Sequence, residues 1–460
     1  MKKNGSNTYK LYCYNGNFWE QTDIPLRKYI GEDLYEFLKK ILIDVFWNVQ
    51  NFNSLKNKLE RLKTLTFGRN VIEKYKEYGV NDSITFDDKW WLFGFNNCVY
   101  DMRAGIIRSY KSDDYVSMTT GYDWIEPSDE EIAFVLNILK KIMPDVDEKT
   151  TYLNILATTI DGRCLEKCVI FNGNGRNGKG MINDLLLTAL GNYGMIGNNS
   201  ILFESSKRGS DPEKANIHKK RCVIFREPPE KSKFENSVIK ELTGGGKFSA
   251  RGHHETDTEK ELNLTMIIEC NQRPLLSEEP TVADVERIID IKFKSTFTSD
   301  ITTINHSNNI FEADPYLKTF EFKNKYKYAL LKILFNVHFS YLNNNSRLFI
   351  ADSIKERTSH YLELSCNIIQ WFKEHYTYSG LSSDILKVGE VFDLFKSSEF
   401  YQYLPKVDKK KYNKSYFTEY IQTNKFFTPF YLERSNSHRN IIRCWKINTP
   451  ESSDTVIIDV

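Results

Sequence analysis

The segment FNGNGRNGKG, residues 171–180, contains residue types that can hold a phosphate group. Gly173, Gly178 and Lys179 have the spacing of a P-loop, in which backbone N–H groups and the lysine ammonium surround the phosphates of a nucleotide. Gly180 stands where that pattern usually has Ser or Thr, whose hydroxyl binds magnesium. The sequence therefore predicts a nucleotide site that lacks one usual metal ligand.

The residues on either side of this segment support the prediction. Residues 168–171 form a short apolar run typical of a buried strand, and residues 181–186 have apolar side chains at helical spacing. A helix that begins at the loop adds its positive N-terminal dipole at the phosphates. The alternative is a glycine turn that caps a helix and binds nothing. The predicted nucleotide-binding residues are Gly173, Asn174, Gly175, Arg176, Asn177, Gly178, Lys179, Gly180 and Met181.

An acidic residue follows the next apolar run, in RCVIFREPPE. A P-loop enzyme needs an acid on a neighbouring strand, to hold magnesium directly or through water and to polarise the attacking water. Glu227 comes directly after the run, and Glu230 lies three residues further on. We predict Glu227 as the Mg²⁺ ligand, directly or through water. The residues leave open whether Glu227 is the metal-side acid or the catalytic base, and which of Glu227 and Glu230 is that base.

Two more polar residues flank later apolar runs. Asn271 ends LTMIIECN, where an amide beside the terminal phosphate can hold the attacking water. Arg287 begins RIIDIKF, where a guanidinium can reach the nucleotide of a neighbouring subunit. Taken alone, Asn271 is a turn former and Arg287 belongs to a surface ion pair. The order of loop, acid, amide and arginine favours catalysis, and the predicted catalytic residues are Lys179, Glu227, Asn271 and Arg287.

This order resembles the superfamily 3 helicases, and more narrowly the helicase part of the poxvirus-type primase–helicases of large DNA viruses. The segments that carry the resemblance are GNGRNGKG, FREPPE, KELTGGGKFSARGHH, CNQRP and DVERIIDIKF. Upstream, FDDKWWLFGFNNCVYDMRAG resembles the accessory domain of that family. The resemblance covers residues 10–375. The chain departs from the family pattern at three places. Gly180 replaces the residue with the magnesium-binding hydroxyl, and Glu286 replaces the first of two arginines. The second acid of the acid motif is displaced by one residue.

The resemblance implies an α/β P-loop ATPase core that is AAA+-like, with a mostly parallel sheet and helices on both faces. The apolar runs KCVIF, RCVIF, LTMIIEC and RIIDIKF have the length and composition of its strands. An α+β accessory domain and a small helical, winged-helix-like module flank the core. The expected domains are an accessory domain at 1–125, a helical connector at 126–165, the ATPase core at 166–300, a helical region packing on the core at 301–375 and the C-terminal module at 376–460.

Local patterns predict further elements. LYCYNGNFWEQ indicates a strand pair around a turn, and YEFLKKILIDVFWNV a helix with Phe37, Ile41 and Val45 on one side. Ser128 and Glu131 form a capping-box pattern at the start of a helix. We expect helical structure over 151–165, one long helix in KERTSHYLELSCNIIQWFKEHY, and a terminal hairpin in RNIIRCWKIN.

The function that the resemblance implies is ATP-driven unwinding of DNA in viral replication, by a ring that translocates on single-stranded DNA and is usually a hexamer. ATP and Mg²⁺ would bind between subunits, with Arg287 supplied by the neighbour. Single-stranded and forked DNA are the implied partners, together with a primase domain or other replication proteins. The first alternative is a P-loop ring ATPase that moves or loads DNA without unwinding it, as a packaging motor does. The second is a binding module whose P-loop is only structural.

The same resemblance points to residues for DNA contact. Segment 243–262 would form a hairpin in the central channel, with Lys247, Arg251, His253 and His254 as candidates for phosphate contact. Each is at least as well explained as an ordinary surface residue. The run KVDKKKYNK gives the C-terminal module either a basic face for DNA or a solvated charge run.

The composition agrees with a soluble globular protein. The 460 residues are 40% hydrophobic and 27% charged, and the net charge of +2 requires any basic surface to be local. Eight scattered cysteines without metal-ligand spacing predict free thiols in a reducing intracellular compartment, by resemblance the host-cell cytoplasm or a viral replication site. No apolar run suits a signal peptide or a membrane span. No primase domain is apparent upstream, so we expect a stand-alone helicase or a truncated chain.

Overall fold

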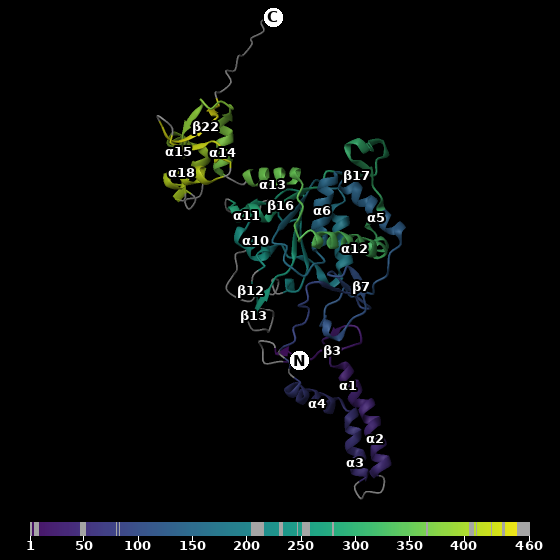
Figure 1. Ribbon diagram of the computed structural model, residues 1–460. Coiled ribbons are helices and arrows are strands. Elements are labelled where there is room, and N and C mark those ends of the chain that lie inside the picture. The colour runs from purple at the N-terminus through teal and green to yellow at the C-terminus, as the bar shows by residue number, and fades with distance from the viewer. Residues whose placement is uncertain are drawn as a thin grey trace. The chain divides into compact units, whose positions relative to one another are not determined.

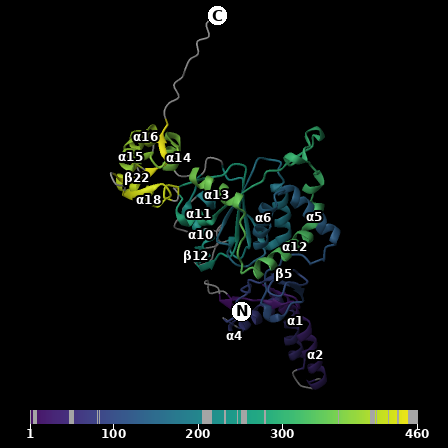
Figure 2. The same cartoon turned by 45° about the horizontal axis from the view of Figure 1, so that its top comes forward.

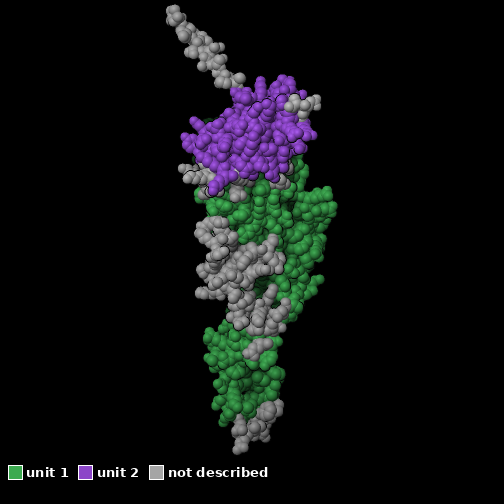
Figure 3. Space-filling view, turned by 90° about the vertical axis from the view of Figure 1, so that its left-hand side faces the viewer, with its two compact units in different colours: residues 1–358 green, residues 359–460 purple. Residues whose placement is uncertain are grey.

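A computed structural model of the chain (Figure 1) describes the following residues: 2–3, 9–46, 52–79, 81, 83–203, 216–229, 233–245, 247–250, 258–277, 280–364, 367–403, 409–410, 412–424, 426–434 and 438–448. The chain divides into two compact units, residues 1–358 and residues 359–460 (Figure 3). Among the described helices, none is long and apolar enough to cross a membrane. The cysteines that the structure describes are free thiols.

The first unit is built around a five-stranded sheet whose paired neighbours all run parallel. The four apolar runs predicted as strands are strands, and most of their residues are buried. The fifth strand, in GMIG, was not predicted, because two glycines in four residues obscure any strand pattern. The order across the sheet is β16 (Ile288–Lys292), β8 (Cys168–Asn172), β14 (Thr265–Cys270), β10 (Cys222–Arg226) and β9 (Gly194–Gly197).

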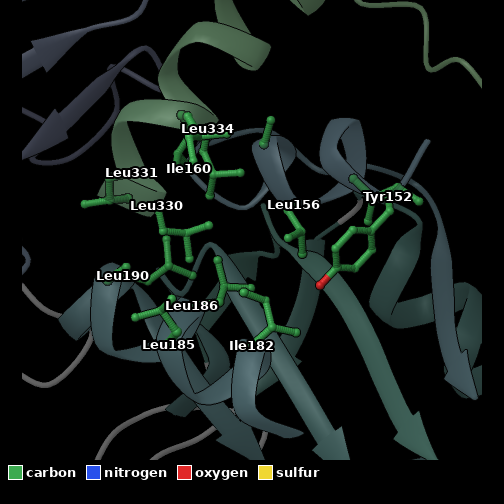
Figure 4. Close-up of a cluster of buried hydrophobic side chains, with 14 of the residues drawn as sticks. Tyr152, Leu156, Ile160, Ile182, Leu185, Leu186, Leu190, Leu330, Leu331 and Leu334 are labelled. Atoms are coloured by element: carbon green, nitrogen blue, oxygen red, sulfur yellow. The ribbon is translucent and has the colours of Figure 1, made fainter. Parts of the chain in front are cut away.

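Helices cover both sides of this sheet. Figures 1 and 2 show α10 (Asn236–Thr243) and α11 (Val282–Arg287) on one side, and α5 (Asp129–Ile142), α6 (Val146–Thr158) and α12 (Phe320–Asn343) on the other. The helix that follows β8, α7 (Lys179–Leu190), packs along α12. Buried leucines fill the space between these two helices, as Figure 4 shows for Leu186, Leu190, Leu330, Leu331 and Leu334.

Among its described residues, the N-terminal part of the first unit contains four α-helices and three small antiparallel sheets, one of which pairs β1 (Lys2–Lys3) with β2 (Tyr9–Lys10). A two-stranded pair, β3 (Cys13–Tyr14) and β4 (Trp19–Glu20), confirms the predicted strand pair around a turn. The helix predicted in YEFLKKILIDVFWNV is α2 (Asp33–Phe46). Phe37, which was predicted on its apolar side, is 61% exposed. The other elements are α1 (Ile24–Gly31), α3 (Phe52–Glu60), α4 (Leu65–Tyr78) and the sheet of β5 (Leu92–Gly94), β6 (Val99–Asp101) and β7 (Ile106–Arg108).

Three local predictions have different outcomes. The capping box is confirmed, because the Ser128 side chain accepts from the backbone of Glu131 at the start of α5. The helix expected over 151–165 ends earlier, since α6 stops at Thr158 and the chain then turns toward β8. The long helix expected near residue 360 is two helices, α13 (Asp352–Leu364) and α14 (Asn367–His375), and the two residues between them lie outside the described part of the chain.

The loop between the last strand of the large sheet and α12 holds a small sheet of its own. Strand β17 (Thr296–Thr298) pairs in parallel with β18 (Ile310–Glu312), and short 3₁₀ turns fill the rest of the segment. This segment lies beside the glycine-rich loop that precedes α7, because the Phe297 N–H donates to the Arg176 carbonyl.

The second unit has its own hydrophobic core, which contains Trp371, Phe372, Phe395, Phe417 and Phe427. A three-stranded antiparallel sheet has the order β20 (Ile385–Lys387), β22 (Arg439–Arg443) and β21 (Tyr431–Arg434). The other elements are α15 (Val388–Ser397), α16 (Glu399–Tyr403), α18 (Lys414–Thr423) and the pair of β19 (Tyr376–Tyr378) with β23 (Trp445–Ile447).

The hairpin predicted in RNIIRCWKIN is wrong. Its two halves are β22 and β23, which belong to different sheets. Cys444 between them has a φ of +67°, in the left-handed region, so the chain changes direction and β23 pairs with β19 instead. The partner of β22 in a true hairpin is the preceding strand β21.

Candidate active site

The glycine-rich segment is the loop between β8 and α7, as the predicted strand–loop–helix order requires. Gly173 has a φ of +147° and Gly178 a φ of +83°. A Cβ atom at Gly173 would lie 2.6 Å from the Phe293 carbonyl oxygen, and one at Gly178 would lie 2.9 Å from a side-chain carbon of Ile142. Both positions therefore require glycine, and the resulting turn brings the loop backbone to the N-terminus of α7.

Lys179 is the first residue of α7 and is only 4% exposed. Its ammonium donates to the Cys270 carbonyl, to Asn271 Oδ1 at 3.3 Å and to the Gly173 carbonyl at 3.4 Å. These three acceptors are neutral and lie at the carboxyl ends of β8 and β14. The positive charge is thus positioned at the strand ends, without a carboxylate among these three partners.

Three of the predicted catalytic residues come together here. Besides its contact with Lys179, Asn271 donates from Nδ2 to Glu227 Oε2 at 3.2 Å. Lys179, Asn271 and Glu227 thus form one hydrogen-bonded chain across the carboxyl ends of three adjacent strands. In parallel α/β sheets, ligands bind at the carboxyl ends of the strands. Glu230, the alternative acid, lies outside the described residues.

Glu227 has an unusual backbone for a residue with a side chain. Its φ is +44°, while its N–H donates to the Glu269 carbonyl on β14 at 2.7 Å. The side chain is exposed. Strained φ values of non-glycine residues concentrate at functional sites, where the surrounding structure holds them. The strain here directs an exposed carboxylate to the end of β10.

A buried acid that sequence reasoning missed lies behind this row of residues. Glu269 on β14 is 6% exposed, and its Oε2 accepts from Asn183 Nδ2 at 3.0 Å. Arg226 Nε lies 3.3 Å from the same oxygen. A Cβ atom at Gly180 would lie 3.3 Å from Glu269 Oε1. An acid inside the apolar run LTMIIEC was the available signal, because carboxylates are rarely buried without a partner or a function.

A second buried carboxylate lies on the other side of β8. Asp290 on β16 accepts from the Asn172 side chain, and Arg273 NH1 lies 3.4 Å from its Oδ2. Burial raises the pKa of Asp290 to about 6, although Arg273 and Arg357 act in the opposite direction. Arg273 comes two residues after Asn271, so this ion pair attaches the segment after β14 to β16.

The structure does not bring Arg287 to the other predicted residues. Arg287 ends α11 and donates to the Ala283 carbonyl at 3.0 Å. The next residue, Ile288, pairs with Cys168 at the start of β8, whereas the glycine-rich loop follows the other end of that strand. The length of β8 separates them by about 16 Å, at 3.3 Å per residue.

A cavity of about 360 Å³ opens beside the loop and α7. Arg176 lies on the side of the cavity that the glycine-rich loop forms. Sequence reasoning indicated only the loop and Met181, because the remaining wall comes from α5 and from residues 297–318, far away in the sequence. The apolar residues that line it are Phe134, Ile138, Met181, Phe297 and Leu317.

The predicted DNA-contacting residues are only partly described. The backbone of segment 243–262 contains a hairpin, in which β12 (Lys247–Ala250) pairs antiparallel with β13 (Thr258–Glu261). Arg251, His253 and His254 lie outside the described residues, as does the side chain of Lys247. The hairpin prediction is therefore confirmed at the level of the backbone.

Comparison with known proteins identifies relatives of the chain. A family profile described as "D5 N terminal like" matches residues 4–159. The putative helicase L207/L206 of Acanthamoeba polyphaga mimivirus is 28% identical over 289 residues, which cover 58% of this chain and 30% of the relative. The primase D5 of Fowlpox virus is 28% identical over 298 residues, covering 61% and 37% of the two chains. The chain is therefore similar in sequence to the poxvirus-type primase–helicases.

The relatives that match are longer than the chain. The putative helicase 121R of Invertebrate iridescent virus 3 is 27% identical over 265 residues, which cover 54% of this chain but 27% of the relative. The chain thus spans well under half the length of the curated relatives it matches. Among solved structures, the C-terminal region of NrS-1 has a TM-score of 0.39 at 13% identity, covering 73% of this chain and 82% of that one.

Proposed function

We propose that the chain is an ATP-dependent DNA helicase of superfamily 3 that acts in viral DNA replication, with an AAA+-like P-loop core. The observation that carries this proposal is the hydrogen-bonded chain of Lys179, Asn271 and Glu227 beside the glycine-rich loop. The similarity to viral relatives supports it, because these are named putative helicases and a primase. The host-cell cytoplasm or a viral replication site is the proposed location.

In this proposal, the loop backbone, the N-terminus of α7 and the Lys179 ammonium hold the ATP phosphates. The exposed Glu227 carboxylate accepts a proton from the attacking water, and the Asn271 amide orients that water. Bound Mg²⁺ would neutralise phosphate charge, and Glu227 would hold it directly or through water. The residues present fit this ion, because the exposed Glu227 carboxylate lies at the carboxyl end of β10, at the same end of the strands as the glycine-rich loop.

The cavity beside α7 is the proposed site for the adenine base. Its volume of about 360 Å³ lies within the range of small-molecule pockets. The rings of Phe134 and Phe297 offer apolar surface to a planar base, and Arg176 stands between this surface and the phosphate loop. ATP would thus extend from the cavity to the end of β14.

We propose that the active unit is a ring, usually a hexamer, because Arg287 lies at the amino ends of the strands, whereas Lys179 lies at their carboxyl ends. A guanidinium in that position can serve only the site of a neighbouring subunit. The hairpin of β12 and β13 would contact single-stranded DNA in the channel, and Lys247, Arg251, His253 and His254 remain candidates. A primase domain or other replication proteins are the further proposed partners.

For the second unit we propose a winged-helix-like fold that binds DNA. A three-stranded antiparallel sheet beside α15 and α18 supports this fold. Lys409, Lys410 and Lys414 put positive charge just before and at the start of α18. Such charges suit contact with DNA phosphates.

The experiment that tests this function uses a forked duplex with a single-stranded tail. Strand displacement that requires both ATP and the tail is the expected result, with Glu227→Gln as the inactive control. ATP hydrolysis that the tail stimulates without strand displacement would instead support the alternative, a ring ATPase that moves or loads DNA. No tail-dependent ATP hydrolysis and no displacement would contradict both.

A further inference from the structure

We propose that Glu269, together with Asn183, supplies the metal-side oxygens that the missing hydroxyl at Gly180 would otherwise provide. This inference rests on the proposed ATP site and concerns a different acid from Glu227. It also gives a physical reason for glycine at position 180.

The position of Glu269 in strand β14 places its carboxylate beside the first turn of α7. Strand β14 lies between β8 and β10, and Glu269 pairs with Phe171 on one side and Arg226 on the other. The nearest atom to a Cβ built at Gly180 is Glu269 Oε1, at 3.3 Å. That separation is tighter than ordinary van der Waals contact, so a serine or threonine at position 180 would crowd the carboxylate.

The two oxygens of Glu269 are used differently. Oε2 accepts from Asn183 Nδ2 and lies 3.3 Å from Arg226 Nε, while Oε1 is the oxygen nearest to Gly180. Arg226 also contacts Asp184 at 2.6 Å, and Asp184 in turn lies 3.6 Å from Lys323. Arg226 thus divides its charge between two carboxylates, and Oε1 of Glu269 lies beside Gly180 in the first turn of α7.

Asn183 provides an independent observation that points to a ligand. Its side chain is fully buried, yet its Oδ1 accepts no hydrogen bond from any described residue. A buried acceptor without a partner costs free energy, and in native proteins it generally has a water or an ion. Asn183 lies three residues after Gly180 on α7, so both face the same side of the helix.

The chemistry of this oxygen pair matches a hard divalent cation. Magnesium binds carboxylate and amide oxygens, and it usually keeps several of its own waters. The Glu269 carboxylate and the Asn183 amide oxygen can therefore hold Mg²⁺ directly or through those waters, beside the helix turn where the hydroxyl normally acts. In the alternative, Glu269 serves only as the ion-pair partner of Arg226.

The test compares Glu269→Gln with Asp184→Asn as the matched control, since each removes one carboxylate that contacts Arg226. Mn²⁺ binding to the complex with mant-AMPPNP is measured by electron paramagnetic resonance, and mant-AMPPNP binding in EDTA by fluorescence. We expect Glu269→Gln to weaken Mn²⁺ binding by about 10- to 100-fold. Nucleotide binding in EDTA should be unchanged, and Asp184→Asn should bind Mn²⁺ as the wild type does.

Gly180→Ser adds a second, independent variant. Because its hydroxyl would compete with Oε1 for the same space, we expect no tighter Mn²⁺ binding in the wild-type background. In the Glu269→Gln background the hydroxyl should recover part of the lost affinity.

Several results would overturn the inference. These are unchanged Mn²⁺ affinity in Glu269→Gln, equal weakening in Asp184→Asn, and clearly tighter Mn²⁺ binding in Gly180→Ser alone. If Glu269→Gln does not fold, Gly180→Ser alone decides. A wild type that binds mant-AMPPNP but fails these tests refutes only the role of Glu269, whereas a wild type that does not bind it refutes the proposed ATP site as well.

Discussion

At the residue scale, the acid and the amide at the strand ends have separable tasks. Glu227→Gln removes the charge that accepts a proton but keeps an acceptor for Asn271 Nδ2. We expect phosphate release to fall by about 10²- to 10⁴-fold. Binding of mant-AMPPNP should persist, since the phosphates are held by the loop and Lys179. A large loss in Glu230→Gln together with normal turnover in Glu227→Gln would reverse the assignment of the base.

Asp290 gives a residue-scale prediction about pH. Burial raises its pKa to about 6, from an ordinary value near 4. Between these values the folded chain binds more protons at this site than the unfolded chain, so the contribution of Asp290 to stability falls as pH rises and is constant above about pH 6. Asp290→Asn should remove this dependence, which is worth about 3 kcal/mol. The unfolding free energies of the two proteins in urea, measured from pH 4 to pH 7, test this. Two curves that remain parallel throughout would contradict it.

At the element scale, the loop between β8 and α7 depends on particular glycines. Gly173→Ala places a methyl group against the Phe293 carbonyl at a φ of +147°, whereas a Cβ at Gly175 meets nothing within 4 Å. We expect Gly173→Ala to lower stability by about 1–3 kcal/mol and to weaken nucleotide binding. Gly175→Ala, its matched control, should leave stability unchanged, because its methyl group meets no atom of the loop. Thermal unfolding and mant-AMPPNP titration of the two variants provide the comparison, and equal behaviour would contradict the account of the loop.

The elements also explain what could be predicted from the sequence. The apolar strands and the polar residues directly after them are local patterns, so β8, β10, β14, β16 and the residues Glu227 and Asn271 were predicted. Glu269 was missed because it lies inside a strand, where its role depends on contacts with α7 and β10. The cavity was missed for the same reason, since its walls come from distant segments. The false hairpin arose because β22 and β23 are adjacent in the sequence, whereas β23 pairs with β19, which lies far upstream.

At the scale of the whole molecule, Arg287 predicts a site shared between subunits. Arg287→Ala and Lys179→Ala should each abolish most ATP hydrolysis, because each damages a different half of the site. In an equal mixture, about a quarter of randomly formed interfaces combine an intact Lys179 with an intact Arg287. Hydrolysis in the mixture should therefore exceed that of either variant alone. A mixture no more active than its components would contradict the shared site.

The central claim is that the loop of residues 173–180 binds ATP for hydrolysis. The most direct measurement is the rate of phosphate release with ATP, Mg²⁺ and single-stranded DNA for the wild type, Lys179→Ala and Lys167→Ala. Lys167 is the matched control, because its ammonium contacts the Glu286 carbonyl, just before the start of β16 and away from the loop. We expect hydrolysis in the wild type and in Lys167→Ala, and a loss of at least about 100-fold in Lys179→Ala. Equal rates in all three proteins would contradict the account.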